Sequence, residues 1–292
     1  ANEAPPAIMS VFIGAQLTKV LSELESVTTG KLSPEEKTDL KLNVVGKIPD
    51  VLLDNTDRNR TSPFAFTGNK FEFRMVGSRD SIAGSNVVLN TIVAEAFAEA
   101  CDVLEKADDF DTAVHSLIKE YLTDHQRIIF NGNGYSDEWV AEAEKRGLPN
   151  IKSMVEAIPA LTTDKAVELF GKFSVFTKAE LESRAEIKYE NYAKAINIEA
   201  KAMIDIAAKQ IIPAVVKYTK ELADTVLAVK EAGADASVQA EMLADISGLL
   251  TETKAALKKL EAVTEEAAGK EEGKVQSEFY HFSVVPAMEG LR

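Results

Sequence analysis

The chain has 292 residues, of which 46% are hydrophobic and 27% charged, so it can build one or two hydrophobic cores. Its formal net charge of −14 disfavours nucleic acid and anionic membranes as partners, although a local basic pocket could still bind a nucleotide. A single cysteine, Cys101, excludes an internal disulfide framework, and the sequence has neither an 18-residue apolar run nor a signal-peptide pattern. We therefore expect a soluble, acidic, cytoplasmic protein.

The N-terminal third changes from a helical to a strand pattern. Residues 8–26 carry apolar side chains at helical spacing, which predicts an amphipathic helix. Within residues 58–76, two arms meet at Gly68-Asn69, and the second arm alternates between apolar and charged residues. Phe71, Phe73 and Met75 share one face, and Lys70, Glu72 and Arg74 share the other. This pattern predicts a β-hairpin.

Helical spacing dominates the rest of the chain. It predicts helices over 87–107 and 110–127, then a short helix capped by Ser136. Thr177-Lys178-Ala179-Glu180 is a capping box that opens a periodic run over 178–292. Pro213 should kink this run without ending it, and Gly233 should break it. Long helices with short connections predict an antiparallel bundle.

The hairpin contains the residues best suited to chemistry. Glu72 and Arg74 alternate on one strand and therefore project from one face, while Arg60 lies on the incoming arm. A carboxylate beside a guanidinium can hold a divalent cation and an anionic substrate together. The alternative is a solvated strand face with a Glu–Arg pair of little energetic weight.

Several strings in the chain closely resemble type III glutamine synthetases. The hairpin, with Asn59-Arg60 on one arm and Glu72-x-Arg74 on the other, is similar to the family's active-site hairpin. Asn2-Glu3-Ala4-Pro5 resembles its flap. Four further strings carry the resemblance: RNRTSPFAFTGNKFEFRMVG, SIAGSN, RIIFNGNGYSDEW and EAEKRGLPN.

This resemblance implies ATP-dependent ligation of ammonia to glutamate through a γ-glutamyl phosphate, with Mg²⁺ or Mn²⁺ as the metal. Glu72 would be a metal ligand. Arg74 would bind glutamate, and Arg60 would bind glutamate or the phosphate in transfer. Glu3, on the flap, would help to deprotonate ammonium. The family assembles as a homo-oligomer of hexameric rings. Position 65, where commoner classes carry an ATP-binding arginine, is Ala65, so Lys70 or Arg58 would have to replace it.

The predicted fold is α+β, predominantly α. Residues 1–110 would be the C-terminal part of a catalytic domain, with the flap at 1–7 and the active-site hairpin at 58–76. A helical domain would follow over 111–292, with its bundle over 178–292.

Two features suggest a fragment of a longer protein. The chain begins at Ala1 without Met, and it stops at Arg292 within a helical pattern. The family's other metal ligands would lie upstream, so we expect the isolated chain to be inactive. Two alternatives stay open: a related γ-glutamyl-amine ligase and a non-catalytic helical assembly module.

Overall fold

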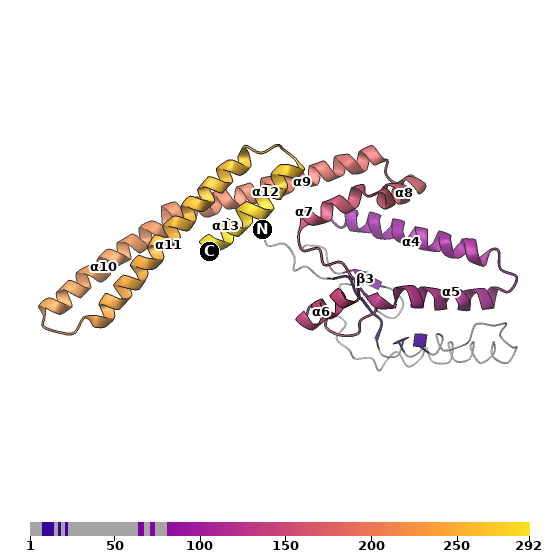
Figure 1. The fold of residues 1–292 in the computed structure, drawn as a ribbon, viewed down its shortest axis with the longest axis horizontal. Helices are drawn as coiled ribbons and strands as arrows, with labels where there is room; N and C mark the ends of the chain where they lie inside the picture. The colour runs from indigo at the N-terminus through magenta and orange to yellow at the C-terminus, as the bar shows by residue number, and fades with distance from the viewer. Residues whose placement is uncertain (1–7, 15–16, 19–20, 23–63, 67–70, 74–80) are drawn as a thin grey trace. The chain divides into compact units, whose positions relative to one another are not determined.

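The computed structural model describes residues 8–14, 17–18, 21–22, 64–66, 71–73 and 81–292 (Figure 1). These residues are mostly helical, with three short strands, and the predicted α+β, predominantly α fold is confirmed. They divide into two compact units. The N-terminal unit takes its described residues from 8–153 and 168–175, and the C-terminal unit comprises 154–167 and 176–292. None of the helices in the described part of the chain is long and apolar enough to cross a membrane.

A small sheet lies in the N-terminal unit. Strand β1 (Val11–Phe12) pairs in parallel with β2 (Phe64–Phe66), and β2 pairs antiparallel with β3 (Phe71–Phe73). The β2–β3 register places Ala65 opposite Glu72 and Phe66 opposite Phe71. The antiparallel pairing predicted for the hairpin is therefore confirmed at its centre, whereas the predicted Gly68-Asn69 turn lies outside the described residues.

Strand β1 corrects the helix predicted over 8–26. Residues 11–12 form a strand, and helical conformation first occurs at Gly14, which has a φ of 79°. The positive φ separates strand from helix, since glycine adopts this region without steric cost. The apolar spacing could not show that Val11 and Phe12 pair with a strand more than 50 residues later.

Helices follow the sheet in the N-terminal unit. Helices α4 (Ala83–Leu104) and α5 (Phe110–His125) match the two predicted helices and lie side by side (Figure 1). A 3₁₀ turn, η2 (Gln126–Ile128), then leads to α6 (Asp137–Lys145). The Ser136 side chain caps α6 by accepting from the backbone N–H of Trp139, as predicted. The α8 helix (Asp164–Lys172) spans the boundary between the units.

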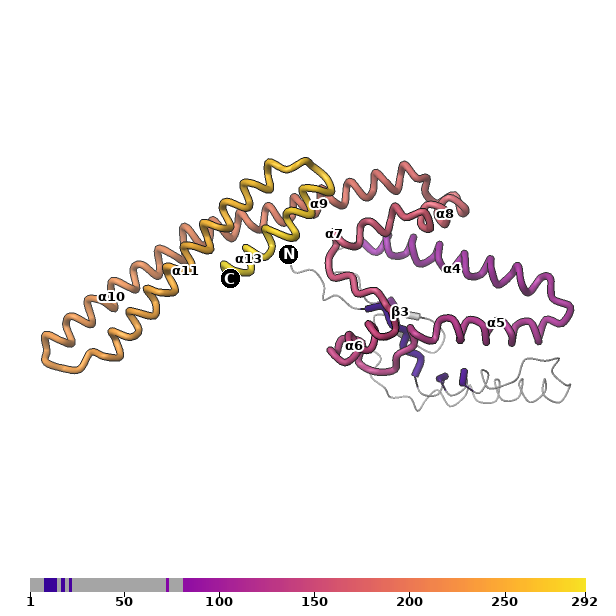
Figure 2. The backbone as a smooth tube through the Cα atoms, in the orientation of Figure 1, coloured from indigo at the N-terminus to yellow at the C-terminus, as the bar shows by residue number. Residues whose placement is uncertain are grey.

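The C-terminal unit begins with α7 (Met154–Ala157) and the 3₁₀ turn η3 (Ile158–Thr162). Helix α9 (Lys178–Ile206) starts at the predicted capping box, where Thr177 and Glu180 bond reciprocally. It continues through a π-helical turn, η4 (Ala207–Ile211), into α10 (Ile212–Glu231) (Figure 2). Pro213 lies just after this turn, and the wider π turn absorbs the proline without ending the helix.

The chain then reverses at Gly233, whose φ is 77°, and returns as α11 (Ser237–Ala268) beside α10 (Figure 1). The helix α12 (Lys274–Phe279), the π-helical turn η5 (Tyr280–Val284) and α13 (Val285–Leu291) complete the unit. Its core lies where these elements meet α9 and α11, around Ile196, Leu260 and Tyr280. The predicted long-helix bundle is thus present, with α10 and α11 as its antiparallel hairpin.

Candidate functional site

Glu72 lies at the centre of β3, in direct register with Ala65 of β2. Because side chains alternate along a strand, Glu72 projects from the face opposite to that of Phe73. Both residues are half-buried. The hairpin therefore presents a carboxylate from one sheet face, and the register sets Ala65 opposite Glu72.

The structure describes Glu72 but not the other predicted site residues. Glu3, Arg60 and Arg74 lie outside the described residues, as do Lys70 and Arg58. Their convergence on Glu72 stays a prediction.

A metal site can be assessed from the donor chemistry of Glu72. Carboxylate oxygen is the donor that Mg²⁺ and Mn²⁺ prefer, and Mg²⁺ in phosphoryl-transfer sites uses one or two carboxylates with substrate phosphates and water. Glu72 fits as one such ligand. No group of three or more His, Cys, Asp or Glu side chains with metal-binding geometry occurs among the residues that the structure describes.

The sheet has a further neighbour, contributed by the residues that follow α5. Val11 of β1 forms a parallel bridge with Ile129, and the Phe130 N–H donates to the Val11 carbonyl oxygen at 3.1 Å. The segment 129–130 therefore extends the sheet beyond β1, on the side away from β2.

Asn131 fixes the turn between β1 and the helix that starts at Gly14. Its Oδ1 accepts from the backbone N–H groups of Ile13 at 3.2 Å and Gly14 at 2.9 Å. Its Nδ2 donates to the Thr18 hydroxyl at 2.7 Å, and that hydroxyl donates to the Gly14 carbonyl. A side chain more than 110 residues away thus satisfies N–H groups that a helix start leaves open.

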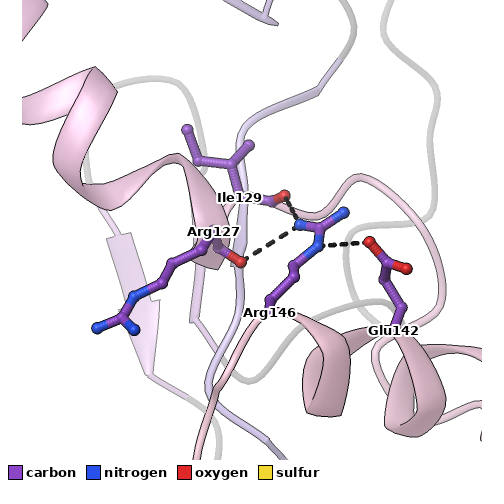
Figure 3. A network of polar contacts seen from close by, with 4 residues as sticks. All are labelled: Arg127, Ile129, Glu142 and Arg146. Carbon is purple, nitrogen blue, oxygen red and sulfur yellow. Dashed lines mark hydrogen bonds and ion pairs between the residues drawn. The ribbon is translucent and has the colours of Figure 1, made fainter.

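Arg146, the C-cap residue of α6, also holds this segment (Figure 3). Its guanidinium donates to the carbonyl oxygens of Ile129 at 3.0 Å and Arg127 at 3.3 Å. It also pairs with the Glu142 carboxylate at 2.7 Å. The guanidinium thus joins the backbone at residues 127 and 129 to Glu142 of α6, and a lysine ammonium does not reproduce its planar fork.

An apolar cluster underlies these bonds. Trp139 is fully buried, its ring stacks on Phe130 at 4.2 Å between centroids, and Ile8 and Ala143 pack with them. The Arg146 guanidinium lies 5.4 Å from the centroid of the Trp139 ring, within cation–π range. The cluster therefore joins Ile8, three residues before β1 begins, to α6.

An open groove of about 590 Å³ adjoins these contacts. It mixes polar and apolar groups, with the exposed charges of Asp124 and Arg127 at its edge. Its lining consists of Ile13, Thr18, Leu21, Ser22, Leu122, Thr123, Asp124, Gln126, Arg127, Ile129, Asn131 and Arg146.

The sequence reasoning missed Asn131 and Arg146. Both lie in strings that carry the family resemblance, but Asn131-Gly132-Asn133-Gly134 reads as a turn cluster by composition. No spacing rule connects Asn131 with Gly14, because their hydrogen bond depends on the tertiary fold.

Comparisons with known proteins agree with the resemblance. A family model described as "Glutamine synthetase C-terminal domain" matches residues 113–230. The whole chain is 37% identical to a glutamine synthetase of Bacteroides fragilis (strain YCH46) and 37% identical to one of Butyrivibrio fibrisolvens. Over 77% of its length it is 42% identical to a type-3 glutamine synthetase of Dictyostelium discoideum.

The chain spans 41% of the length of each bacterial relative and 31% of the Dictyostelium protein. The resemblance to type III glutamine synthetases, stated from sequence motifs, is confirmed: the two bacterial glutamine synthetases match the whole chain, and the type-3 protein matches 77% of it.

Proposed function

From the confirmed resemblance of this chain to type III glutamine synthetases, we propose that the complete protein makes glutamine from glutamate, ammonia and ATP. The glutamate γ-carboxylate takes the terminal phosphoryl group of ATP, which gives γ-glutamyl phosphate and ADP. Ammonia then attacks the acyl carbon, loses a proton and displaces phosphate. Among the described residues, the observation that supports the proposal is Glu72, a half-buried carboxylate on the strand that pairs with β2.

The proposed roles follow from charge. Phosphoryl transfer between anions needs fixed positive charge, which Arg60 and Arg74 would supply at glutamate and at the phosphate in transfer. Glu3 would accept a proton from ammonium. A Mg²⁺ or Mn²⁺ ion bound by Glu72 would neutralise phosphate charge.

The chain's share of its relatives limits what it does alone. Because the relatives are more than twice as long, we propose that catalysis requires the complete protein and that the isolated chain is inactive. We propose that the complete protein is cytoplasmic. We also propose that it assembles as a homo-oligomer of hexameric rings.

A substrate comparison tests the reaction. The complete protein should form glutamine and phosphate from glutamate, ATP and Mg²⁺ when ammonium is supplied. Equal or greater product formation with polyamines or ethanolamine in place of ammonium would instead favour a γ-glutamyl-amine ligase.

A Glu72→Gln variant tests the site. This substitution preserves the size of the side chain and removes its negative charge. We therefore expect the rate of glutamine synthesis to fall by about 100-fold and the Mg²⁺ concentration for half-maximal activity to rise. Glu105→Gln, at the exposed C-cap of α4, is the matched control. Unchanged synthesis by Glu72→Gln would refute a metal-binding role.

One observation favours a second role, in assembly, for the α10–α11 hairpin. A groove of about 340 Å³ between these helices is lined almost entirely by apolar side chains, including Ile211, Tyr218 and Leu249. Leu249 is 62% exposed, so another subunit could bury it.

The assembly role predicts that Leu249→Arg reduces the mass of the complete particle in light scattering. Leu227→Arg is the matched control, because Leu227 is 61% exposed and lies outside the groove lining. Deletion of 178–292 should have the larger effect. An unchanged mass in Leu249→Arg would discount the groove as a subunit contact.

A further inference from the structure

We infer that residues 126–148 belong to the active-site framework, with Asn131 and Arg146 acting as positioning residues for glutamine synthesis. The inference rests on the proposed function and extends it to a segment that the proposed roles of Glu3, Arg60, Glu72 and Arg74 do not include. The contacts of β1 carry the argument.

Strand β1 links this segment to the candidate metal ligand. On one side β1 pairs with β2, which pairs with β3 and Glu72. On its other side β1 bridges to Ile129 and accepts a hydrogen bond from Phe130. The position of Glu72 therefore depends, through two strand pairings, on where residues 129–130 hold β1.

Strand β1 also lies close in sequence to Glu3. Ile8, five residues after Glu3, is 4% exposed and packs in the cluster of Trp139. Three residues further on, β1 begins, and Asn131 then fixes Ile13 and Gly14. The chain that leads away from Glu3 is thus held by α6 and Asn131.

Arg146 fixes the segment 127–131 to α6. Its bonds to the carbonyls of Arg127 and Ile129 fix the backbone on which the Val11 bridge and the Asn131 side chain depend (Figure 3). Neither Asn131 nor Arg146 needs to contact a substrate. Their effect on the reaction passes through β1.

The test uses two substitutions of Asn131 in the complete enzyme. Asn131→Leu keeps the side chain's size but removes the acceptor for the Ile13 and Gly14 N–H groups. Asn131→Asp keeps an acceptor oxygen and places a negative charge at a helix N-terminus, where it is favourable. We expect Asn131→Leu to lower kcat/KM for ammonium and to raise the Mg²⁺ concentration for half-maximal activity, each about 10- to 100-fold. Asn131→Asp should stay within about threefold of wild type.

Hydrogen exchange separates positioning from loss of the fold. In Asn131→Leu the amides of Ile13 and Gly14 should exchange at least about tenfold faster, while those of α4 and α9 keep their wild-type rates. If Asn131→Leu does not fold, Thr18→Val replaces it, because this change removes the acceptor of the Asn131 amide, together with the hydroxyl's own bond to the Gly14 carbonyl. A fall of about 3- to 10-fold in kcat/KM is then expected.

Faster exchange at Ile13 and Gly14 with unchanged kinetics would overturn the inference, and so would equal losses in Asn131→Leu and Asn131→Asp. Unchanged kinetics in Thr18→Val, where that variant is used, would overturn it too. If wild-type enzyme makes no glutamine, the proposed function fails and this inference fails with it. If wild-type enzyme is active and the variants match it, only this inference fails.

Discussion

Replacing Arg146 with Met should destabilise the N-terminal unit by about 3 kcal/mol. Methionine preserves the unbranched, apolar part of the side chain and removes every donor. The carbonyl of Ile129 loses a charge-assisted hydrogen bond and stays without that partner, which costs about 1–3 kcal/mol. The Glu142 pair contributes about 0.5 kcal/mol, because the two side chains are 28% and 39% exposed. The contact with the Trp139 ring adds about 0.5–1 kcal/mol.

Urea unfolding followed by fluorescence measures this loss. Trp139 is the sole tryptophan of the chain and is fully buried beside Arg146, so its emission reports on this cluster. With a slope of about 2 kcal/mol per M urea, the midpoint should fall by about 1.5 M. Arg184→Met is the matched control, because the exposed Arg184 guanidinium stacks on Phe176 in the other unit. Equal midpoints in Arg146→Met and Arg184→Met would refute the reasoning.

Two further predictions concern the C-terminal unit. Hydrogen bonds from the backbone N–H and hydroxyl of Thr177 lower the pKa of the Glu180 carboxyl. The stabilisation that these bonds contribute is therefore present above the ordinary glutamate pKa of about 4.3, and it is lost as the pH falls through the lowered pKa. Thr177→Ala should cost about 1 kcal/mol at pH 7 and reduce this acid dependence in thermal unfolding in part, because the backbone N–H of residue 177 still donates to Glu180, whereas an unaltered pH profile would contradict it. Gly248→Ala, inside α11 with open space at its Cβ, should stabilise by about 0.5–1 kcal/mol. Gly233→Ala also has open space but a φ of 77°, so it should destabilise by about 1–2 kcal/mol, and unfolding shifts of the same sign in both variants would disprove this.

Local sequence signals predicted much of this structure. Ser136 and Thr177 cap their helices as expected, because a capping residue and its partner lie within three positions of each other. Gly233 ends the long helical run for an equally local reason, its positive φ. The pairing of β2 with β3 follows from strand alternation and a short connection.

Contacts between distant residues account for what the sequence could not predict. Strand β1 carries apolar spacing that fits a helix as well, and its pairing with β2 and Ile129 decides the outcome. Asn131 reads as a turn residue until the fold brings Gly14 to it. The candidate site shows the same limit: Glu72 was predicted from family motifs, but the neighbours of its sheet were not.

The convergence of Glu72, Arg60 and Arg74 on one bound substrate is the central claim, and anomalous scattering from Mn²⁺ tests it most directly. Crystals of the complete enzyme with glutamate, a non-hydrolysable ATP analogue and Mn²⁺ should show a manganese peak at the Glu72 carboxylate. The glutamate carboxylates should lie within hydrogen-bond distance of Arg60 and Arg74. A manganese peak away from Glu72, or glutamate bound without either arginine, would contradict the account.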